Sequence, residues 1–160
     1  MASKIQLSIP SLLSFKGRLR RLHYWVTNLC LAILKAVCTT ILAAAAWRIE
    51  VKDEGFAAAV VELVFLWPTL ALVVKRGHDR GRSALFSSVV LGVGIAAAMT
   101  ATMVPLHMNQ TVGGVCLVLA VSAFGYLFID YGLIDGPRGP NRYGPSPKGA
   151  SDRSVADPAR

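Results

Sequence analysis

Four long apolar stretches, separated by short clusters of charge, constrain the fold of this chain more than any other feature. They cover residues 24–46, 57–74, 84–105 and 112–134. A hydrocarbon layer about 30 Å thick needs roughly 20 apolar residues in a helix that rises about 1.5 Å per residue. None of the stretches alternates apolar and polar residues as a membrane β-strand does. The sequence therefore predicts an all-α membrane protein, built as a four-transmembrane-helix bundle.

Composition agrees with one membrane domain flanked by polar ends. Hydrophobic residues make up 54% of the 160 residues and charged residues only 16%, below the usual quarter of a soluble domain. We expect an interfacial N-terminal segment (1–23), a transmembrane domain (24–134) and a cytoplasmic tail rich in Gly and Pro (135–160). The first span is too long for a signal peptide, and three more spans follow it, so we expect it to be retained.

The distribution of Lys and Arg predicts the orientation. Of the 17 basic residues, about fourteen lie before the first span, between the second and third spans, or after the fourth. A four-span topology places these three segments on one side of the membrane, and short loops rich in Lys and Arg stay in the cytoplasm. We therefore predict a multi-pass protein of the bacterial inner membrane with both ends inside the cell.

Residues 11–23, ahead of the first span, interleave leucine and phenylalanine with Lys16, Arg18, Arg20 and Arg21. This pattern predicts an amphipathic helix lying in the membrane interface. The alternative is that these charges act only as a topogenic signal.

Three ionisable residues fall inside the predicted spans: Lys35, Glu62 and Asp130. Lys35 belongs to a polar and small stripe on the first span, which we expect to face other helices. Measured from the ends of the apolar stretches, Lys35 and Glu62 differ by roughly 9 Å in depth, which disfavours a direct pair. These residues either line a polar pathway, as in a small transporter or transport accessory, or fix helix packing, and their different depths favour packing. The stripe consists of Asn28, Ala32, Lys35, Thr39 and Ala43.

Three short motifs lie at the predicted cytoplasmic side, at residues 15–25, 75–83 and 136–147. In order, they resemble the motifs of the family called domain of unknown function 805 (DUF805): Phe-x-Gly-Arg…Tyr-Trp, then an Arg…His-Asp-x-x-Arg-Ser loop, then Gly-x-x-Gly-x-Asn-x-x-Gly-x-x-Pro. Gly77 stands where leucine is more usual in that family. The resemblance implies an integral inner-membrane protein and supplies no established activity. Its candidate residues here are Gly17, Arg18, Arg21, Tyr24, Trp25, Arg76, His78, Asp79, Arg80, Arg82, Ser83, Asn141, Gly144 and Pro147.

The motifs do not form a recognisable catalytic or metal site. His78 and Asp79 are adjacent, and neighbours in a helix do not face each other. No serine or cysteine is placed as a nucleophile beside them. The three histidines lie on different segments, and the three cysteines have no paired spacing. We therefore predict no catalytic residue, no metal and no cofactor, and an enzyme acting on a lipid headgroup is the least favoured class.

The candidate arginines favour anion recognition or a structural role. Arginine forks suit phosphate, and five of them would converge at headgroup level, with Asp79 orienting one and Asn141 tying the last motif to the bundle. The simpler interpretation is that these charges enforce topology and hold the loops together, and we favour it. We expect a non-enzymatic membrane protein that binds anionic lipid, a partner protein or a second copy of itself. The net charge of +8 follows from the orientation, so we expect no nucleic acid partner.

Overall fold

A computed structural model describes residues 13–48, 54–103 and 110–147 of the chain. These residues form α2 (Arg21–Arg48), α3 (Glu54–Asp79), α4 (Ala84–Met103) and α5 (Gln110–Tyr126), which continues as the π-helix η1 (Leu127–Leu133). The only β-type pairing in the described ranges is an isolated bridge between Asn141 and Gly144. Four helices are long and apolar enough to cross a membrane. The predicted all-α, four-span fold is confirmed, and the protein is a multi-pass membrane protein.

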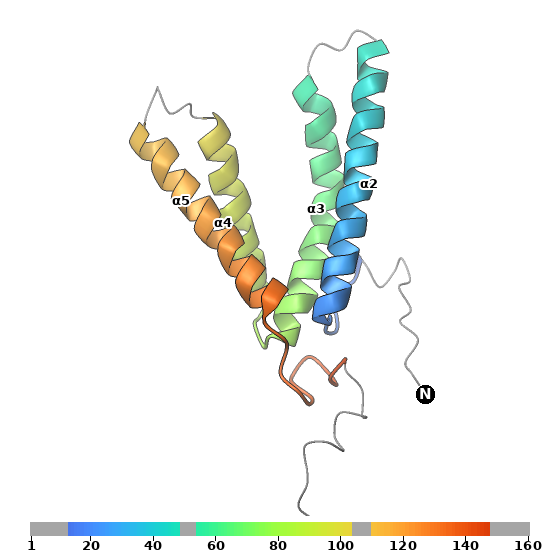
Figure 1. The fold of residues 1–160 in the computed structure, drawn as a ribbon, viewed down its shortest axis with the longest axis vertical. Coiled ribbons are helices and arrows are strands. Elements are labelled where there is room, and N and C mark those ends of the chain that lie inside the picture. Colours follow the sequence, from blue (N-terminus) through green and yellow to red (C-terminus); the bar gives the residue numbers. More distant parts are fainter. Residues whose placement is uncertain (1–12, 49–53, 104–109, 148–160) are drawn as a thin grey trace, which may run out of the picture.

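The four spans form two antiparallel hairpins, α2 with α3 and α4 with α5 (Figure 1). The hairpins meet at one end and diverge toward the other (Figure 1). Helix α3 lies at the junction, where it packs against α2, α4 and η1. A cluster of buried residues fills this junction, consisting of Val73, Leu91, Leu127 and Tyr131.

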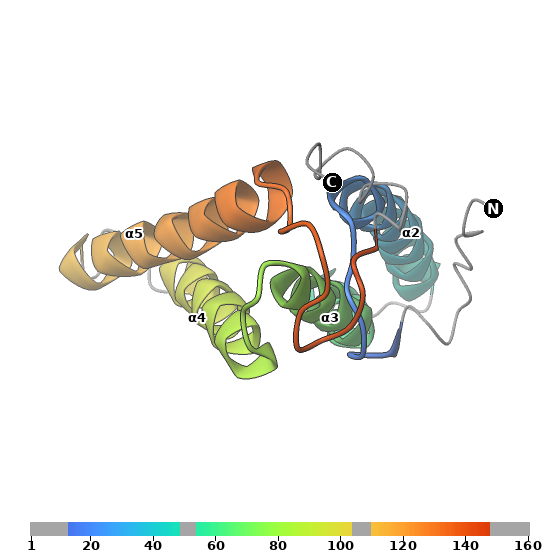
Figure 2. The ribbon, with the colours of Figure 1, turned by 90° about the horizontal axis from the view of Figure 1, so that it is seen from below.

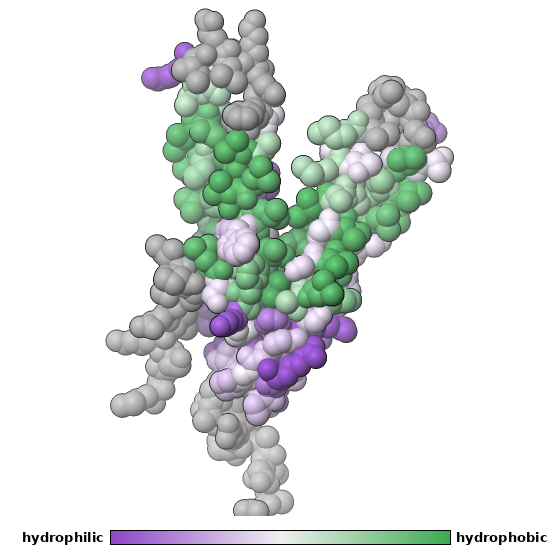
Figure 3. Space-filling model, turned by 180° about the vertical axis from the view of Figure 1, so that it is seen from behind, coloured by the Kyte–Doolittle hydropathy of each residue, from purple (hydrophilic) through white to green (hydrophobic). Residues whose placement is uncertain are grey.

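Polar and basic residues gather at the end where the hairpins meet, below the apolar surface of the spans (Figure 3). We call it the basic end. The N-terminal segment, residues 14–20, and the C-terminal segment, residues 135–147, both lie at this end and cross beneath α3 (Figure 2). The basic end is the one that charge asymmetry predicts to face the cytoplasm.

The helix predicted over residues 11–23 does not form through its middle. Residues 14–20 are irregular, and α2 begins only at Arg21. Gly17 has a φ of +94°, a left-handed conformation that favours glycine and interrupts a helix. Residues 1–12 lie outside the described ranges.

The second span continues past its predicted end at residue 74. Helix α3 runs on through the basic residues to Asp79 and also passes through Pro68 without a break. It ends in a Schellman motif: Gly81 N–H donates to the His78 carbonyl and Arg82 N–H to the Gly77 carbonyl. Gly81 has the positive φ, +74°, that this motif requires. The charged residues remain helical because the surrounding segments bury them.

Helix α4 starts directly after this turn because Ser83 caps it. The Ser83 hydroxyl accepts a hydrogen bond from the backbone N–H of Phe86 at 3.1 Å. This is the usual pairing between an N-cap side chain and the third helical residue. The Arg-Ser ending of the second motif is therefore a helix start, which fixes where the second hairpin leaves α3.

Candidate functional site: an arginine network at the basic end

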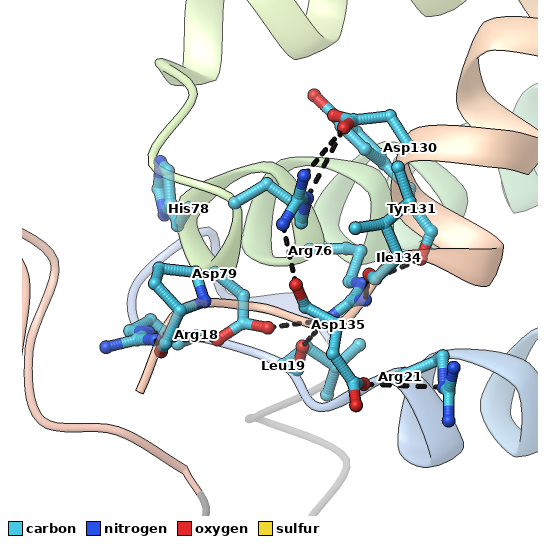
Figure 4. Close-up of polar contacts among 12 residues, drawn as sticks. Arg18, Leu19, Arg21, Arg76, His78, Asp79, Asp130, Tyr131, Ile134 and Asp135 are labelled. Carbon is cyan, nitrogen blue, oxygen red and sulfur yellow. Dashed lines mark hydrogen bonds and ion pairs between the residues drawn. The ribbon is translucent and has the colours of Figure 1, made fainter. Parts of the chain in front are cut away.

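Asp79, the last residue of α3, lies between two arginines from different motifs. Its Oδ1 accepts from Arg18 Nε at 3.0 Å, and its Oδ2 accepts from Arg76 Nη1 at 2.5 Å (Figure 4). The three side chains are at most 4% exposed. A buried carboxylate with two guanidinium partners is compensated, whereas the loss of one arginine would leave charge poorly paired. The first and second motifs therefore meet in one buried ion cluster.

The guanidinium of Arg76 also donates to three backbone carbonyls. Its Nε donates to the Tyr131 carbonyl at 2.7 Å, Nη1 to the Leu19 carbonyl at 3.2 Å and Nη2 to the Ile134 carbonyl at 2.5 Å (Figure 4). The planar fork of arginine suits several acceptors at fixed positions, and a lysine ammonium does not. Arg76 thus joins α3 to the N-terminal segment and to the end of η1.

The end of the fourth span explains why these donors are needed. The last carbonyls of a helix have no partner within it. Two at this end, those of Tyr131 and Ile134, accept from Arg76; two more accept from the first motif, Gly132 from Trp25 Nε1 at 2.9 Å and Leu133 from Arg21 Nη1 at 2.8 Å. The positive guanidinium groups also complement the negative end of the helix dipole. Residues of two motifs therefore cap one helix.

Arg18 performs the same task for the C-terminal segment. Its Nη1 donates to the Gly139 carbonyl at 2.7 Å and to the Gly144 carbonyl at 3.3 Å, and its Nη2 donates to the Pro137 carbonyl at 3.0 Å. Gly139 and Gly144 both have positive φ, +99° and +126°. The third motif is therefore a loop folded around an arginine from the first.

Asn141 ties this loop to α3. Its side-chain amide donates to the His78 carbonyl at 2.9 Å, and its Oδ1 accepts from the Tyr143 backbone N–H at 2.9 Å. The ring of Tyr143 stacks on the His78 ring at 3.8 Å between centroids, and His78 Nδ1 lies 3.2 Å from the Gly17 carbonyl. Within the described residues, the contacts of the His78 side chain are therefore ring stacking and hydrogen bonding.

Asp130, near the end of the fourth span, also contacts residues of the basic end. Arg80 Nη2 lies 3.0 Å from its Oδ1, Arg82 Nε lies 3.8 Å from its Oδ2, and the Tyr126 hydroxyl donates to Oδ2 at 3.1 Å. Arg80 also donates to the Asp135 carbonyl at 2.6 Å. The end of the fourth span thus turns Asp130 toward the arginines, as the favoured packing role requires, and a pathway shared with Lys35 and Glu62 stays a prediction.

Lys35 and Glu62 do form a pair, contrary to the depth argument. The Lys35 ammonium lies 2.6 Å from Glu62 Oε1. Lys35 is fourteen residues from the start of α2, and Glu62 is thirteen residues before Lys75, whose carbonyl accepts from Leu19 just ahead of α2. Both positions thus stand roughly 20 Å above the same level. The depth argument counted from the ends of the predicted apolar stretches. It failed because α3 continues past residue 74, where the second stretch ends, as far as Asp79.

The polar stripe predicted on α2 is rotated slightly. Lys35, Asn28 and Thr39 are partly buried, as a stripe facing α3 requires, whereas Ala32 and Ala43 are exposed. Leu31 and Cys38 are partly buried in place of the alanines.

Several residues that position this network were absent from the prediction. The Tyr131 hydroxyl and Ser87 Oγ are 2.7 Å apart and buried. A Cβ at Gly77 would overlap Ser87 Oγ, so glycine lets α3 and α4 approach here. Gly132 is similarly confined by the ring of Trp25. Gly132 and Tyr131 could have been identified from their place at the end of the fourth span, because the last carbonyls of that helix need donors from elsewhere in the chain.

A small cavity lies beside the network, with a volume of about 140 Å³. Arg20 and Arg21 line it together with Asp79, Asp135 and parts of the C-terminal segment that include Ser146 and Pro147. Arg21 Nε lies 3.4 Å from Asp135 Oδ1, and both side chains are about half exposed. The described residues contain no group of three or more His, Cys, Asp or Glu side chains that could hold a metal ion.

Comparison with known proteins gives a family match whose range contains the arginines of this network. The model of the family described as Protein of unknown function (DUF805) matches residues 12–145. The protein called "Uncharacterized protein YiiR" of Escherichia coli K12 is 28% identical over 134 residues, which cover 83% of this chain and 85% of that protein. The O157:H7 form of YiiR gives the same values. No solved structure shows a significant match. The match covers all four spans and most of the N- and C-terminal segments, and the chain belongs to the DUF805 family.

Proposed function

We propose that this protein is a non-enzymatic component of the bacterial inner membrane whose basic end binds anionic lipid headgroups. The observation that carries this proposal is the sorting of its basic residues into two sets. One set, Arg18, Arg76 and Arg80, has side chains that are at most 20% exposed and that donate to carboxylates and carbonyls within the chain. The other set, which we call the rim, is exposed at the same end and consists of Lys16, Arg20, Arg21, Arg82, Arg138 and Arg142.

The rim is suited to a leaflet of anionic lipid. Its members lie at the start of α2 or in the segments that flank the helices, at the end of the molecule where the apolar surface of the spans gives way to polar residues (Figure 3). A basic residue near an anionic surface contributes about 1 kcal/mol of attraction, and the buried set keeps the rim residues at fixed positions. The buried arginines contribute to this function by holding the scaffold, because their own forks are occupied.

Lipid composition around the purified protein tests the proposal. The protein is reconstituted into nanodiscs from equal amounts of phosphatidylglycerol and phosphatidylcholine, extracted in mild detergent, and its co-purifying lipids are quantified. We expect enrichment of phosphatidylglycerol, reduced at least fivefold in the triple variant Lys16→Gln, Arg82→Gln, Arg138→Gln, which leaves the arginines of the cavity unchanged. Arg48→Gln, an exposed arginine at the opposite end of α2, is the matched control and should retain the enrichment. Equal enrichment in the triple variant and the wild type would refute the proposal.

A second candidate function, a small transporter or transport accessory, rests on the Lys35–Glu62 pair. Both side chains keep substantial exposure, 38% and 61%, on helices that cross the membrane. Intramembrane ionisable groups are candidates for ion pathways. Proton flux into vesicles, followed with a trapped pH-sensitive dye, tests this function. Flux that is present in the wild type and lost in Lys35→Leu would favour transport over a packing role.

A further inference from the structure

The cavity beside the network has walls that suit one particular chemical group. We infer that it binds the phosphodiester group of one membrane phospholipid. This inference rests on the proposed function and adds to it a defined site with a fixed stoichiometry, where the rim alone would attract lipid without fixing any single molecule.

The charges around the cavity favour an anion. Arg20 is exposed, lines the cavity, and its side chain has no hydrogen-bond or ion-pair partner among the described residues. Arg21 donates to the Leu133 carbonyl and lies 3.4 Å from Asp135, so it carries its charge to the same wall. Asp79 also lines the cavity, but two guanidinium groups already compensate it. Apart from the compensated Asp79, the charged lining is two arginines and the single carboxylate of Asp135, which leaves a positive site.

The size and position of the cavity select the source of the phosphate. A volume of about 140 Å³ is several times the roughly 30 Å³ share of one water in the liquid, yet below the size of typical pockets for whole ligands. The site therefore suits a headgroup phosphate and leaves the remainder of the molecule outside. Leu22 also lines the cavity and is 69% exposed at the start of the first span. An apolar side chain at the mouth suits an acyl-bearing ligand better than free phosphate.

Native mass spectrometry of the detergent-solubilised protein tests this site through the number of retained phospholipids. We expect one tightly held phospholipid on the wild type. Arg20→Gln should lower its occupancy at least about tenfold, because a hydrogen bond to a charged group is lost. Lys16→Gln is the matched control: it removes one exposed charge from the rim without touching the cavity, and it should leave the lipid in place. Arg20→Lys should keep part of the occupancy.

The outcomes separate this site from the proposed function. Equal retention in Arg20→Gln and the wild type would overturn the cavity site, while the nanodisc enrichment reports on the rim independently. Equal losses in Arg20→Gln and Lys16→Gln would also overturn it, because rim charge alone would explain them. Displacement of the retained lipid by glycerol 3-phosphate or inorganic phosphate at millimolar concentration would assign the cavity to a free phosphate ester and overturn the lipid assignment.

Discussion

Replacement of Arg76 by methionine should lower the free energy of unfolding by about 3 to 5 kcal/mol, the range for breaking a buried ion pair. Arg76 is fully buried and donates to Asp79 and to the carbonyls of Leu19, Tyr131 and Ile134. Methionine fills similar space but donates nothing. Each buried carbonyl left without a donor costs about 1 to 3 kcal/mol, and those nearest the surface recover part of this loss through water.

The loss is measured by equilibrium unfolding in mixed micelles, with helix content followed by circular dichroism as a denaturing detergent is added. Arg82→Met is the matched control. Its side chain is 48% exposed and lies 3.8 Å from Asp130, and an exposed pair contributes at most about 1 kcal/mol. Arg76→Lys separates charge from geometry, because one ammonium cannot replace a fork with four acceptors. Equal stability of Arg76→Lys and wild type would refute the capping argument, and so would equal losses in Arg76→Met and Arg82→Met.

Three further predictions concern packing and connections. Gly77→Leu should destabilise the bundle by about 1 to 3 kcal/mol in the same unfolding assay, because its Cβ would overlap a serine hydroxyl on α4; unchanged stability would contradict this contact. Asn141→Ala should release the C-terminal segment, so that trypsin cleaves faster at Arg142; an unchanged cleavage rate would contradict the tie to α3. Lys35→Leu should lower the free energy of unfolding by about 1 to 2 kcal/mol, because it leaves Glu62 without its partner. The double variant with Glu62→Leu should lose less, because neither charge remains; a double variant less stable than Lys35→Leu would argue against the pair.

The spans were predictable from sequence because the hydrocarbon layer sets a simple length rule. Long apolar stretches forecast the spans to within a few residues, except where α3 continues to Asp79. That exception has a physical cause. Hydropathy treats Arg76 as a loop residue, whereas the folded chain buries it against carbonyls that only the tertiary structure brings near. A local scale cannot register donors and acceptors more than fifty residues apart.

The sequence predicted which residues belong to the site, but it predicted only in part what each of them does. The motifs identified the arginines that converge, but their forks face the protein in the case of Arg18 and Arg76. The basic residues whose side chains stay exposed, among them Arg20 and Lys16, stand out less in the sequence than the motif arginines. Burial separates the two sets, and burial here follows from the path of the N-terminal segment beneath α3. The π-helical end of the fourth span, which presents Asp130 to the arginines, has no clear sequence signature.

The division of the arginines into a buried network and an exposed rim is tested most directly by hydrogen exchange of their side chains. Nitrogen-15 NMR of the protein in micelles near neutral pH resolves arginine Nε–H groups, and Arg→Lys variants assign them. We predict slow exchange for Arg18 and Arg76, which donate from Nε to Asp79 and the Tyr131 carbonyl, and fast exchange for the exposed Arg20. Equally fast exchange at all three positions would contradict the network on which this account rests.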